Sequence, residues 1–291
     1  MRGKRRQTGS VIPIVRRLLV AAVQAYSFAA DVFEPYGSWL AESVTRSREE
    51  DVMTKYYEPE HFEGYARIRR EGLDQWNDLH PDDRGGGYNN FSNREFLAAQ
   101  MPQAAGLGLN VLEYGCGTGS AACFLAERGY RVHAVDLVPD AIAIARERVA
   151  QRGLRVRFDV QDICEWRESD EQYDFVVDAF CLNSIVIDED RARVLNGVRR
   201  RLNSGGRYLL STSVYRPDRE YGEEHFDAGT GIVWVPTAGP GEAALLLDGT
   251  WYLPHRRHVT STALRAELAG HGFRVLDLQE PFGANLVCEL S

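Results

Sequence analysis

The sequence is poor in cysteine and carries no excess of positive charge. Its five cysteines are odd in number and scattered, without the spacing of a zinc site or a disulfide framework, so we expect free thiols, no bound metal and a reducing, cytoplasmic setting. The 291 residues have a net charge of −8 and no sustained basic patch, which argues against a nucleic-acid partner because phosphate neutralisation supplies much of that affinity. A small molecule or another protein is left as the partner.

Long apolar runs are also scarce. An apolar run over 18–30 follows six basic residues and has the layout of an export signal, but it is too short to span a bilayer comfortably. We therefore expect no stable membrane insertion. Two other interpretations of 1–52 stay open, namely a start at Met53 and an amphipathic or disordered extension without a catalytic role. A chain that starts at Met53 is expected to keep its activity.

The most informative stretch is a glycine-rich turn between an apolar strand and a helix. The strand over 111–114 runs into Gly115, Gly117 and Gly119. Glycine permits positive φ and leaves no Cβ to block a ligand, and the turn delivers backbone N–H groups to a helix N-terminus, which favours a bound carboxylate or phosphate. A glycine turn alone is weak evidence, because dinucleotide-binding folds use a similar device.

Two further predicted strands end in acids. The strand over 131–136 ends in Asp136, and the segment 156–163 contains Asp162. Because the carboxyl ends of parallel strands meet at one edge of a sheet, these acids are expected beside the glycine turn, where open α/β sheets bind ligands. A fourth strand over 173–180 has a central apolar run that suits burial on both faces.

This spacing resembles the class I S-adenosylmethionine-dependent methyltransferases. The resemblance rests on Glu113 with the three glycines, on Asp136, on the triplet 161–163 and on the segment 202–207, and it covers roughly 105–213. It implies an enzyme that moves the methyl group of S-adenosylmethionine to an oxygen, nitrogen or sulfur atom of a small molecule by in-line displacement. A protein or peptide acceptor and a homodimer both stay open.

The resemblance and the strand–helix alternation predict a doubly wound α/β fold with a mostly parallel seven-stranded sheet. The final hairpin is expected to be antiparallel because a short turn joins its strands. The expected parts are an N-terminal extension over 1–52, a helical lid over 53–104, a cofactor-binding core over 105–213, a β-rich cap inserted over 214–261, and a helix and hairpin over 262–291 that complete the core.

The resemblance also assigns roles around the cofactor. Asp136 is expected at the ribose hydroxyls, and Asp162 with the Ile163 N–H is expected at the adenine. Glu113 is expected to anchor the methionine ammonium, directly or through water. The full set of expected cofactor-binding residues is Tyr57, Glu113, Gly115, Cys116, Gly117, Gly119, Asp136, Leu137, Asp162, Ile163, Asp178 and Ala179.

Three of these residues concern the sulfonium. Asp178 and Ala179 close the fourth strand and are expected beside it, where Asp178 would help electrostatically. Tyr56 or Tyr57 is expected to turn its ring toward this cation, and Tyr57 is the one included among the expected cofactor-binding residues.

No general base stands out. The segment 181–184 resembles a family stretch that often carries His where Asn183 stands, and Asn cannot act as a base at neutral pH. The candidates for a catalytic role are His258 and Tyr215, with two further cap histidines, His225 and His255, behind them. The segment 256–258 is, alternatively, a site for an acidic acceptor.

Two other classes of function remain open. A nicotinamide-dependent oxidoreductase on a similar sheet would share Gly115, Gly117 and Asp136, but it would not explain Asp162 or the terminal hairpin. A non-catalytic regulatory subunit that binds the cofactor or a partner also stays open, because no base is identified.

Overall fold

The computed structural model describes residues 54–80, 87–104, 106–221, 224–281 and 283–291. The expectations for 1–52 lie outside these residues. None of the helices in the described ranges is long and apolar enough to cross a membrane.

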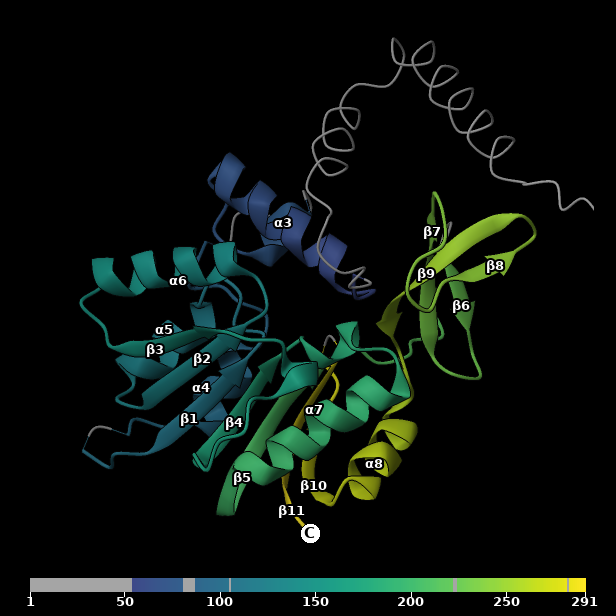
Figure 1. Ribbon diagram of the computed structural model, residues 1–291. Coiled ribbons are helices and arrows are strands. Elements are labelled where there is room, and N and C mark those ends of the chain that lie inside the picture. The colour runs from purple at the N-terminus through teal and green to yellow at the C-terminus, as the bar shows by residue number, and fades with distance from the viewer. Residues whose placement is uncertain (1–53, 81–86, 105, 222–223, 282) are drawn as a thin grey trace, which may run out of the picture. The chain divides into compact units, whose positions relative to one another are not determined.

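A seven-stranded sheet forms the centre of the described chain (Figure 1), in the order β10-β11-β5-β4-β1-β2-β3. Strands β1 to β5 pair in parallel, and β11 runs antiparallel to both β5 and β10. The predicted doubly wound α/β fold with a reversed final hairpin is thereby confirmed. The strands are β1 (Asn110–Tyr114), β2 (Arg131–Asp136), β3 (Val156–Val160), β4 (Tyr173–Ala179), β5 (Leu202–Thr212), β10 (Phe273–Gln279) and β11 (Ala284–Leu290).

Helices cover both faces of this sheet because neighbouring strand residues point in opposite directions. Leu112 of β1 belongs to one apolar cluster, together with side chains of α7 and α8. Its neighbour Val111 belongs to a second cluster, together with side chains of α4, α5 and α6. The helices are α4 (Arg94–Gln100), α5 (Ser120–Glu127), α6 (Pro139–Gln151), α7 (Asp188–Arg201) and α8 (Ser261–Gly270).

A second, antiparallel sheet lies in the chain between β5 and α8, and we refer to it as the cap sheet. Its order is β6-β7-β9-β8, from β6 (His225–Asp227), β7 (Ile232–Thr237), β8 (Leu245–Leu247) and β9 (Thr250–Arg257). Asp248 and Gly249 join β8 to β9, and both have positive φ, at 47° and 83°. Positive φ at both central residues is what a two-residue hairpin of this twist requires, and Asp-Gly is a preferred pair for it.

Helix α3 (Glu58–Glu71) connects the cap sheet to the main sheet's helices. Near its start, Glu60 forms an ion pair with Arg256 of β9 at 2.8 Å. Near its end, Arg69 forms an ion pair with Asp140 of α6 at 3.1 Å. The short 3₁₀ helix η1 (Trp76–Leu79) packs against α3. These contacts hold α3 and η1 over the edge of the sheet where the glycine turn lies.

Candidate functional site

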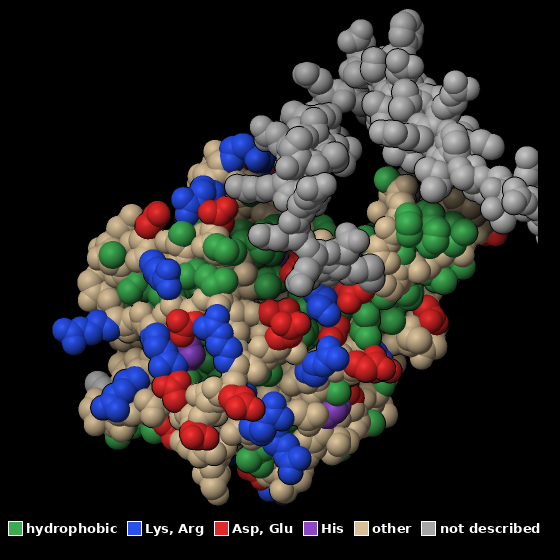
Figure 2. Space-filling view, in the orientation of Figure 1, with side chains coloured by type: hydrophobic (Ala, Val, Ile, Leu, Met, Phe, Trp, Pro, Cys, Tyr) green, Lys and Arg blue, Asp and Glu red, His purple; other side chains and the backbone are tan. Residues whose placement is uncertain are grey.

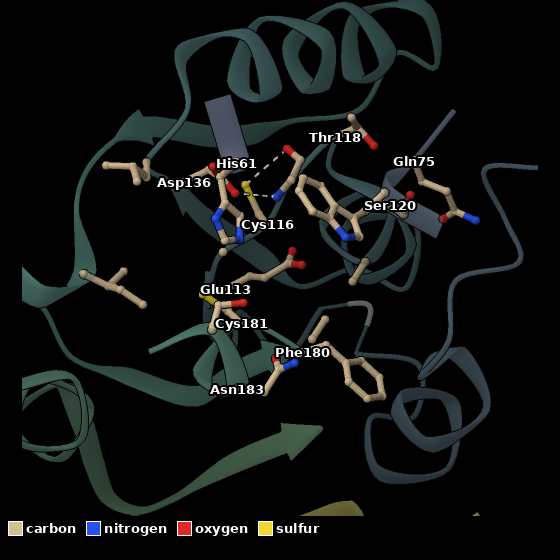
Figure 3. Close-up of a pocket in the computed structure, with 18 of the residues that line it drawn as sticks. His61, Gln75, Glu113, Cys116, Thr118, Ser120, Asp136, Phe180, Cys181 and Asn183 are labelled. Carbon is tan, nitrogen blue, oxygen red and sulfur yellow. Dashed lines mark hydrogen bonds between the residues drawn. The ribbon is translucent and has the colours of Figure 1, made fainter. Parts of the chain in front are cut away.

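A cavity of about 570 Å³ opens at the carboxyl ends of β1, β2 and β4 (Figure 3). The glycine turn and the strand ends form one wall. The elements α3 and η1, the segments before α4 and after β4, and Arg256 of β9 form most of the rest. The expected cofactor residues that line it are Tyr57, Glu113, Gly115, Cys116, Gly117, Asp136, Leu137, Asp162, Ile163 and Ala179. The two other expected residues, Gly119 and Asp178, are not part of this lining.

The three glycines of the turn have the expected positive φ, and they also permit close contacts with other parts of the protein. Their φ angles are positive, at 61° for Gly115, 53° for Gly117 and 80° for Gly119, which residues with a Cβ rarely adopt. A Cβ on Gly115 would collide with the Cys181 side chain, and one on Gly117 would lie 2.6 Å from the Tyr65 hydroxyl. The glycines therefore permit close packing of protein against protein, and Gly119 serves as the N-cap of α5.

Asp136 ties the glycine turn to β2. Its Oδ2 accepts the Gly117 N–H at 2.8 Å, and its Oδ1 accepts the Val138 N–H at 2.9 Å. Burial raises the pKa of Asp136 to about 6, against the lowering effect of these amides. A carboxylate offers about four lone-pair sites, so room remains for two hydroxyl donors from the cavity side. This acceptor capacity suits a diol such as a ribose.

Glu113 is a buried carboxyl with an unused oxygen. Only 1% of the residue is exposed, and its Oε2 has no hydrogen-bond partner in the described part of the chain. Burial, reinforced by the neighbouring Asp136 and Asp178, raises its pKa well above the ordinary range. An unpaired acid of this kind on a cavity wall suits a cationic donor, because a positive charge would restore its ionised form. The methionine ammonium of the expected cofactor is such a donor.

Other polar atoms on the cavity wall also lack a partner. Ser120 Oγ, Gln161 Nε2 and Asn183 Oδ1 are buried without a hydrogen bond to any described residue. Buried polar groups in folded proteins are nearly always paired, so such atoms around one cavity indicate a polar ligand. The wall thus fits a compound with both donors and acceptors.

The two adjacent tyrosines have different surroundings. The Tyr57 hydroxyl donates to Asp162 Oδ2 at 2.7 Å, and Asp162 Oδ1 accepts the Cys164 N–H at 2.8 Å. The Tyr56 hydroxyl instead accepts the Val186 N–H at 3.0 Å, away from the cavity lining. Tyr57 therefore closes the end of the cavity assigned to the adenine, and the expected contact of its ring with the sulfonium stays a prediction.

Asp178 has a structural task after β4, and its expected place beside the sulfonium stays a prediction that these contacts do not favour. The residue is fully buried and does not line the cavity. Its Oδ1 accepts the Cys181 N–H at 2.6 Å, and its Oδ2 accepts the Leu182 N–H at 3.0 Å and the Tyr114 hydroxyl at 2.7 Å. Since both oxygens are used by the backbone and a buried tyrosine, Asp178 fixes the turn after β4.

The candidate catalytic residues of the cap lie off the cavity. His258 is 2% exposed and contacts the Tyr221 hydroxyl at 3.3 Å, and burial, with Arg219 and Arg256 nearby, lowers its pKa to about 4. The Tyr215 ring stacks on Phe226 at 5.4 Å. Neither His258 nor Tyr215 is part of the cavity lining. A catalytic role for them stays a prediction from sequence that the geometry does not favour.

The two arginines considered for an acidic acceptor are already neutralised. Arg256 donates a hydrogen bond to each Glu60 carboxylate oxygen at 2.8 Å, and the same carboxylate contacts His255 at 3.0 Å. Arg257 donates to the Val186 carbonyl at 2.9 Å and pairs with Asp188. Each guanidinium already pairs with a carboxylate, which argues against a second anion at this segment.

Sequence patterns missed much of the remaining wall. It includes His61 on α3, Trp76 on η1, Phe91 to Asn93 before α4, and Phe180 to Ile185 after β4, apart from Leu182. Phe180 has φ of 66°, a rare conformation for a residue with a side chain. The aromatic-rich character of 53–104 indicated a lid, but no local pattern indicates which of its rings turn inward.

Residues 111–206 match the protein-family model described as "Methyltransferase domain". The chain is 33% identical over 113 residues to the 2-heptyl-1-hydroxyquinolin-4(1H)-one methyltransferase of Mycobacteroides abscessus. This aligned stretch covers 38% of this chain and 49% of that protein. The chain is 32% identical over 106 residues to the ubiquinone biosynthesis O-methyltransferase of Xylella fastidiosa, over 36% and 42% of the two chains. The chain spans about half the length of these curated relatives, or less.

Solved structures share the fold. The CcbJ methyltransferase from Streptomyces caelestis superposes with a TM-score of 0.55 at 18% identity, over 75% of this chain and 97% of that one. DhpI, solved in complex with SAH, gives a TM-score of 0.54 at 20% identity, over 81% and 97%. At these identities the likeness speaks for the fold alone.

Proposed function

We propose that the protein transfers the methyl group of S-adenosylmethionine to an oxygen, nitrogen or sulfur atom of a small molecule. The match of residues 111–206 to the methyltransferase domain model and the methyltransferase relatives support this proposal. The cofactor supplies an electrophilic methyl group on a sulfonium, together with its leaving group. The protein is then left to bind, align and exclude water. Such positioning can contribute about 7–11 kcal/mol to lowering the barrier.

The observation that carries this proposal is the unpaired Glu113 Oε2 at the glycine turn. It gives the methionine ammonium a partner at one end of the cavity. Asp136 would hold the ribose hydroxyls next to it, and Asp162 with Tyr57 would close the adenine end. Cys116, like the glycines around it, contributes backbone rather than thiol chemistry, because burial raises its thiol pKa well above the ordinary range.

A small-molecule acceptor in the cytoplasm is the form of this function that we favour. The two relatives named above carry names that refer to a hydroxyquinolone and to ubiquinone biosynthesis. On the face drawn in Figure 2, Lys and Arg side chains are interspersed with Asp and Glu, so that face offers no continuous basic surface to a nucleic acid. The net charge of −8 supports the same choice. The cytoplasmic setting follows from the scattered cysteines and from the cofactor.

Calorimetric titration with S-adenosylhomocysteine, with NADH as the competing ligand class, tests the proposal. We expect saturable binding of S-adenosylhomocysteine alone, and a loss of at least about tenfold in affinity in Asp136→Asn, since a hydrogen bond to a charged group contributes about 1.5–3 kcal/mol. The substitution Asp277→Asn, an acid on β10 outside the cavity lining, is the control. Binding of NADH alone would support an oxidoreductase instead, and binding of neither by a folded sample would remove the cofactor assignment.

A further inference from the structure

The histidine that the cavity contains is His61, on α3. Its Nδ1 lies 2.6 Å from the Tyr57 carbonyl oxygen. A carbonyl oxygen can only accept a hydrogen bond, so Nδ1 carries the proton. In the neutral ring, Nε2 is then the acceptor. The ring is held in this orientation by stacking on Trp76, with centroids 5.1 Å apart and planes 24° apart.

The acceptor atom of His61 is available to a ligand. His61 faces the same cavity as Cys116 and Asp136 (Figure 3), and no described residue forms a hydrogen bond to its Nε2. The residue is only partly buried, and it is part of the cavity lining. A fixed imidazole with one free lone pair is the arrangement that proton transfer requires.

The rest of the wall offers no comparable base. Asn183 stands after β4, and the cap residues His258 and Tyr215 lie off the cavity. Burial raises the thiol pKa of Cys181 and the hydroxyl pKa of Tyr65 well above their ordinary ranges, so both groups stay protonated. Outside the three carboxyls assigned to the cofactor, His61 is thus the described wall residue that can accept a proton near neutral pH.

The same part of the wall carries no net charge. Apart from the carboxyls assigned to the cofactor, its charged side chain is Arg256, and Glu60 neutralises the guanidinium at 2.8 Å. Burying an unpaired charge is costly, so an anionic acceptor would find no partner here. An uncharged acceptor with a hydroxyl group meets both conditions, since it enters neutral and loses a proton only as it reacts.

We propose that His61 Nε2 accepts the proton of an uncharged hydroxyl compound as that compound receives the methyl group, an assignment that rests on the proposed function. The O–H bond breaks and an Nε2–H bond forms, which leaves the ring as imidazolium. The oxygen forms its bond to the methyl carbon while the carbon–sulfur bond breaks and its electron pair returns to sulfur. The positive charge passes from sulfonium to imidazolium, and the ring then releases the proton to water.

Charged groups around His61 set the pH range of this step. Burial lowers the pKa of His61, Arg256 and His255 on β9 lower it further, and Glu60 on its own helix opposes them. On η1, the Oδ2 atom of Asp78 accepts hydrogen bonds from the backbone N–H groups of Asp74 and Gln75. On β2, Asp136 is bound to two amides. The net direction is downward, so His61 is neutral and able to accept a proton at pH 7, and kcat/KM should fall as the pH drops through its pKa.

The test uses His61→Asn, because the Asn amide can still donate to the Tyr57 carbonyl while the Nε2 position is lost. Formation of S-adenosylhomocysteine is measured from pH 5 to pH 9 with phenol, catechol and 8-hydroxyquinoline, and with benzoate as an anionic probe. We expect a loss of about 10²–10⁴-fold in kcat/KM with the hydroxyl probes, without the acidic inflection of the wild type. Free imidazole should restore part of the rate in His61→Ala. His271→Asn, directly after α8 and outside the cavity lining, is the matched control.

The outcomes separate this assignment from the proposed function. Affinity for S-adenosylhomocysteine should be preserved in His61→Asn, and a wild type that fails to bind it would overturn the function itself. Wild-type rates and pH profile in His61→Asn, or benzoate methylated as fast as phenol, would overturn the assignment alone. If no probe turns over, nitrogen NMR of His61 with S-adenosylhomocysteine bound decides: a shift of Nε2 on adding 8-hydroxyquinoline supports the assignment, and no shift with any hydroxyl probe overturns it.

Discussion

The two walls of the cavity are built in different ways. The strand-end wall consists of residues at or just after the ends of paired strands and in the turn that follows β1, namely Glu113, Gly115 to Gly117, Asp136 and Asp162. The lid wall, made of His61, Tyr65, Trp76 and Arg256, consists of side chains from a helix, a 3₁₀ turn and the cap sheet. The first is fixed by backbone pairing within one sheet, whereas the second depends on side-chain contacts between segments far apart in the chain.

The contrast assigns different chemistry to each wall. The strand-end wall holds the acids that suit the donors of the cofactor. The lid wall holds the free imidazole and the neutralised guanidinium that suit an uncharged acceptor. Substitutions in the first should therefore affect folding and cofactor affinity, and substitutions in the second should affect turnover and lid attachment.

The largest effect on stability is expected for Gly115→Ala on the strand-end wall. The positive φ costs about 1–2 kcal/mol for a residue with a Cβ, and the collision with Cys181 adds about 1–3 kcal/mol of overpacking. Gly153→Ala is the matched control, because Gly153 also has positive φ, at 65°, but no atom within 4 Å of the added Cβ. Denaturant unfolding measures both. Equal losses of unfolding free energy would show that close packing at the turn contributes nothing.

A smaller effect is expected for Glu60→Gln on the lid wall. The substitution removes the charge that holds Arg256 and His255 of β9, and because Glu60 is partly exposed we expect a loss of about 1 kcal/mol or less in global stability. Hydrogen exchange at the start of α3 should rise clearly. Arg67→Ala, which removes an exposed ion pair with Glu71 further along α3, should leave that exchange unchanged. Exchange unaltered by Glu60→Gln would mean that packing alone holds the lid.

The same contact predicts a pH dependence. His255 and Arg256 hold the pKa of Glu60 far below its ordinary value, against the opposing effect of burial. A carboxyl whose folded-state pKa is depressed contributes stability above its unfolded pKa of about 4.3 and loses it as the pH falls toward the folded value. Attachment of α3 to β9 should therefore weaken below about pH 4.3, and Glu60→Gln should remove this dependence. Exchange rates at the start of α3, measured between pH 3 and pH 6, give the answer.

The smallest effect is expected for His258→Asn. The sequence pattern predicts a catalytic role with reduced turnover, whereas its buried position off the cavity predicts turnover within about twofold of wild type once folding is preserved. Turnover of the hydroxyl probes, measured beside His61→Asn, decides between them. A loss in His258→Asn as large as that in His61→Asn would move the chemistry to the cap and break the contrast between the walls.

The sequence located the strand-end wall well because its signals are local. Alternating apolar strands, a glycine turn and acids at strand ends place Asp136 and Asp162 at one edge, since parallel strands bring their carboxyl ends together. Asp178 is the exception among the acids at strand ends. Asp178 lies at the same edge, yet its carboxylate is taken by the turn after β4, and the sequence pattern is the same for an acid that points out as for one that points in.

What the sequence by itself determined is the fold class, the order of the core elements and the acids and glycines of the strand-end wall, because these follow from backbone periodicity and from φ angles that only glycine readily adopts. The tertiary structure decided the lid wall. The Nε2 of His61 is free because Nδ1 donates to a carbonyl one turn away and the ring stacks on Trp76. The positive charge of Arg256 is balanced by Glu60, 196 positions earlier in the chain. Contacts of that range depend on how whole elements pack, which no local pattern encodes.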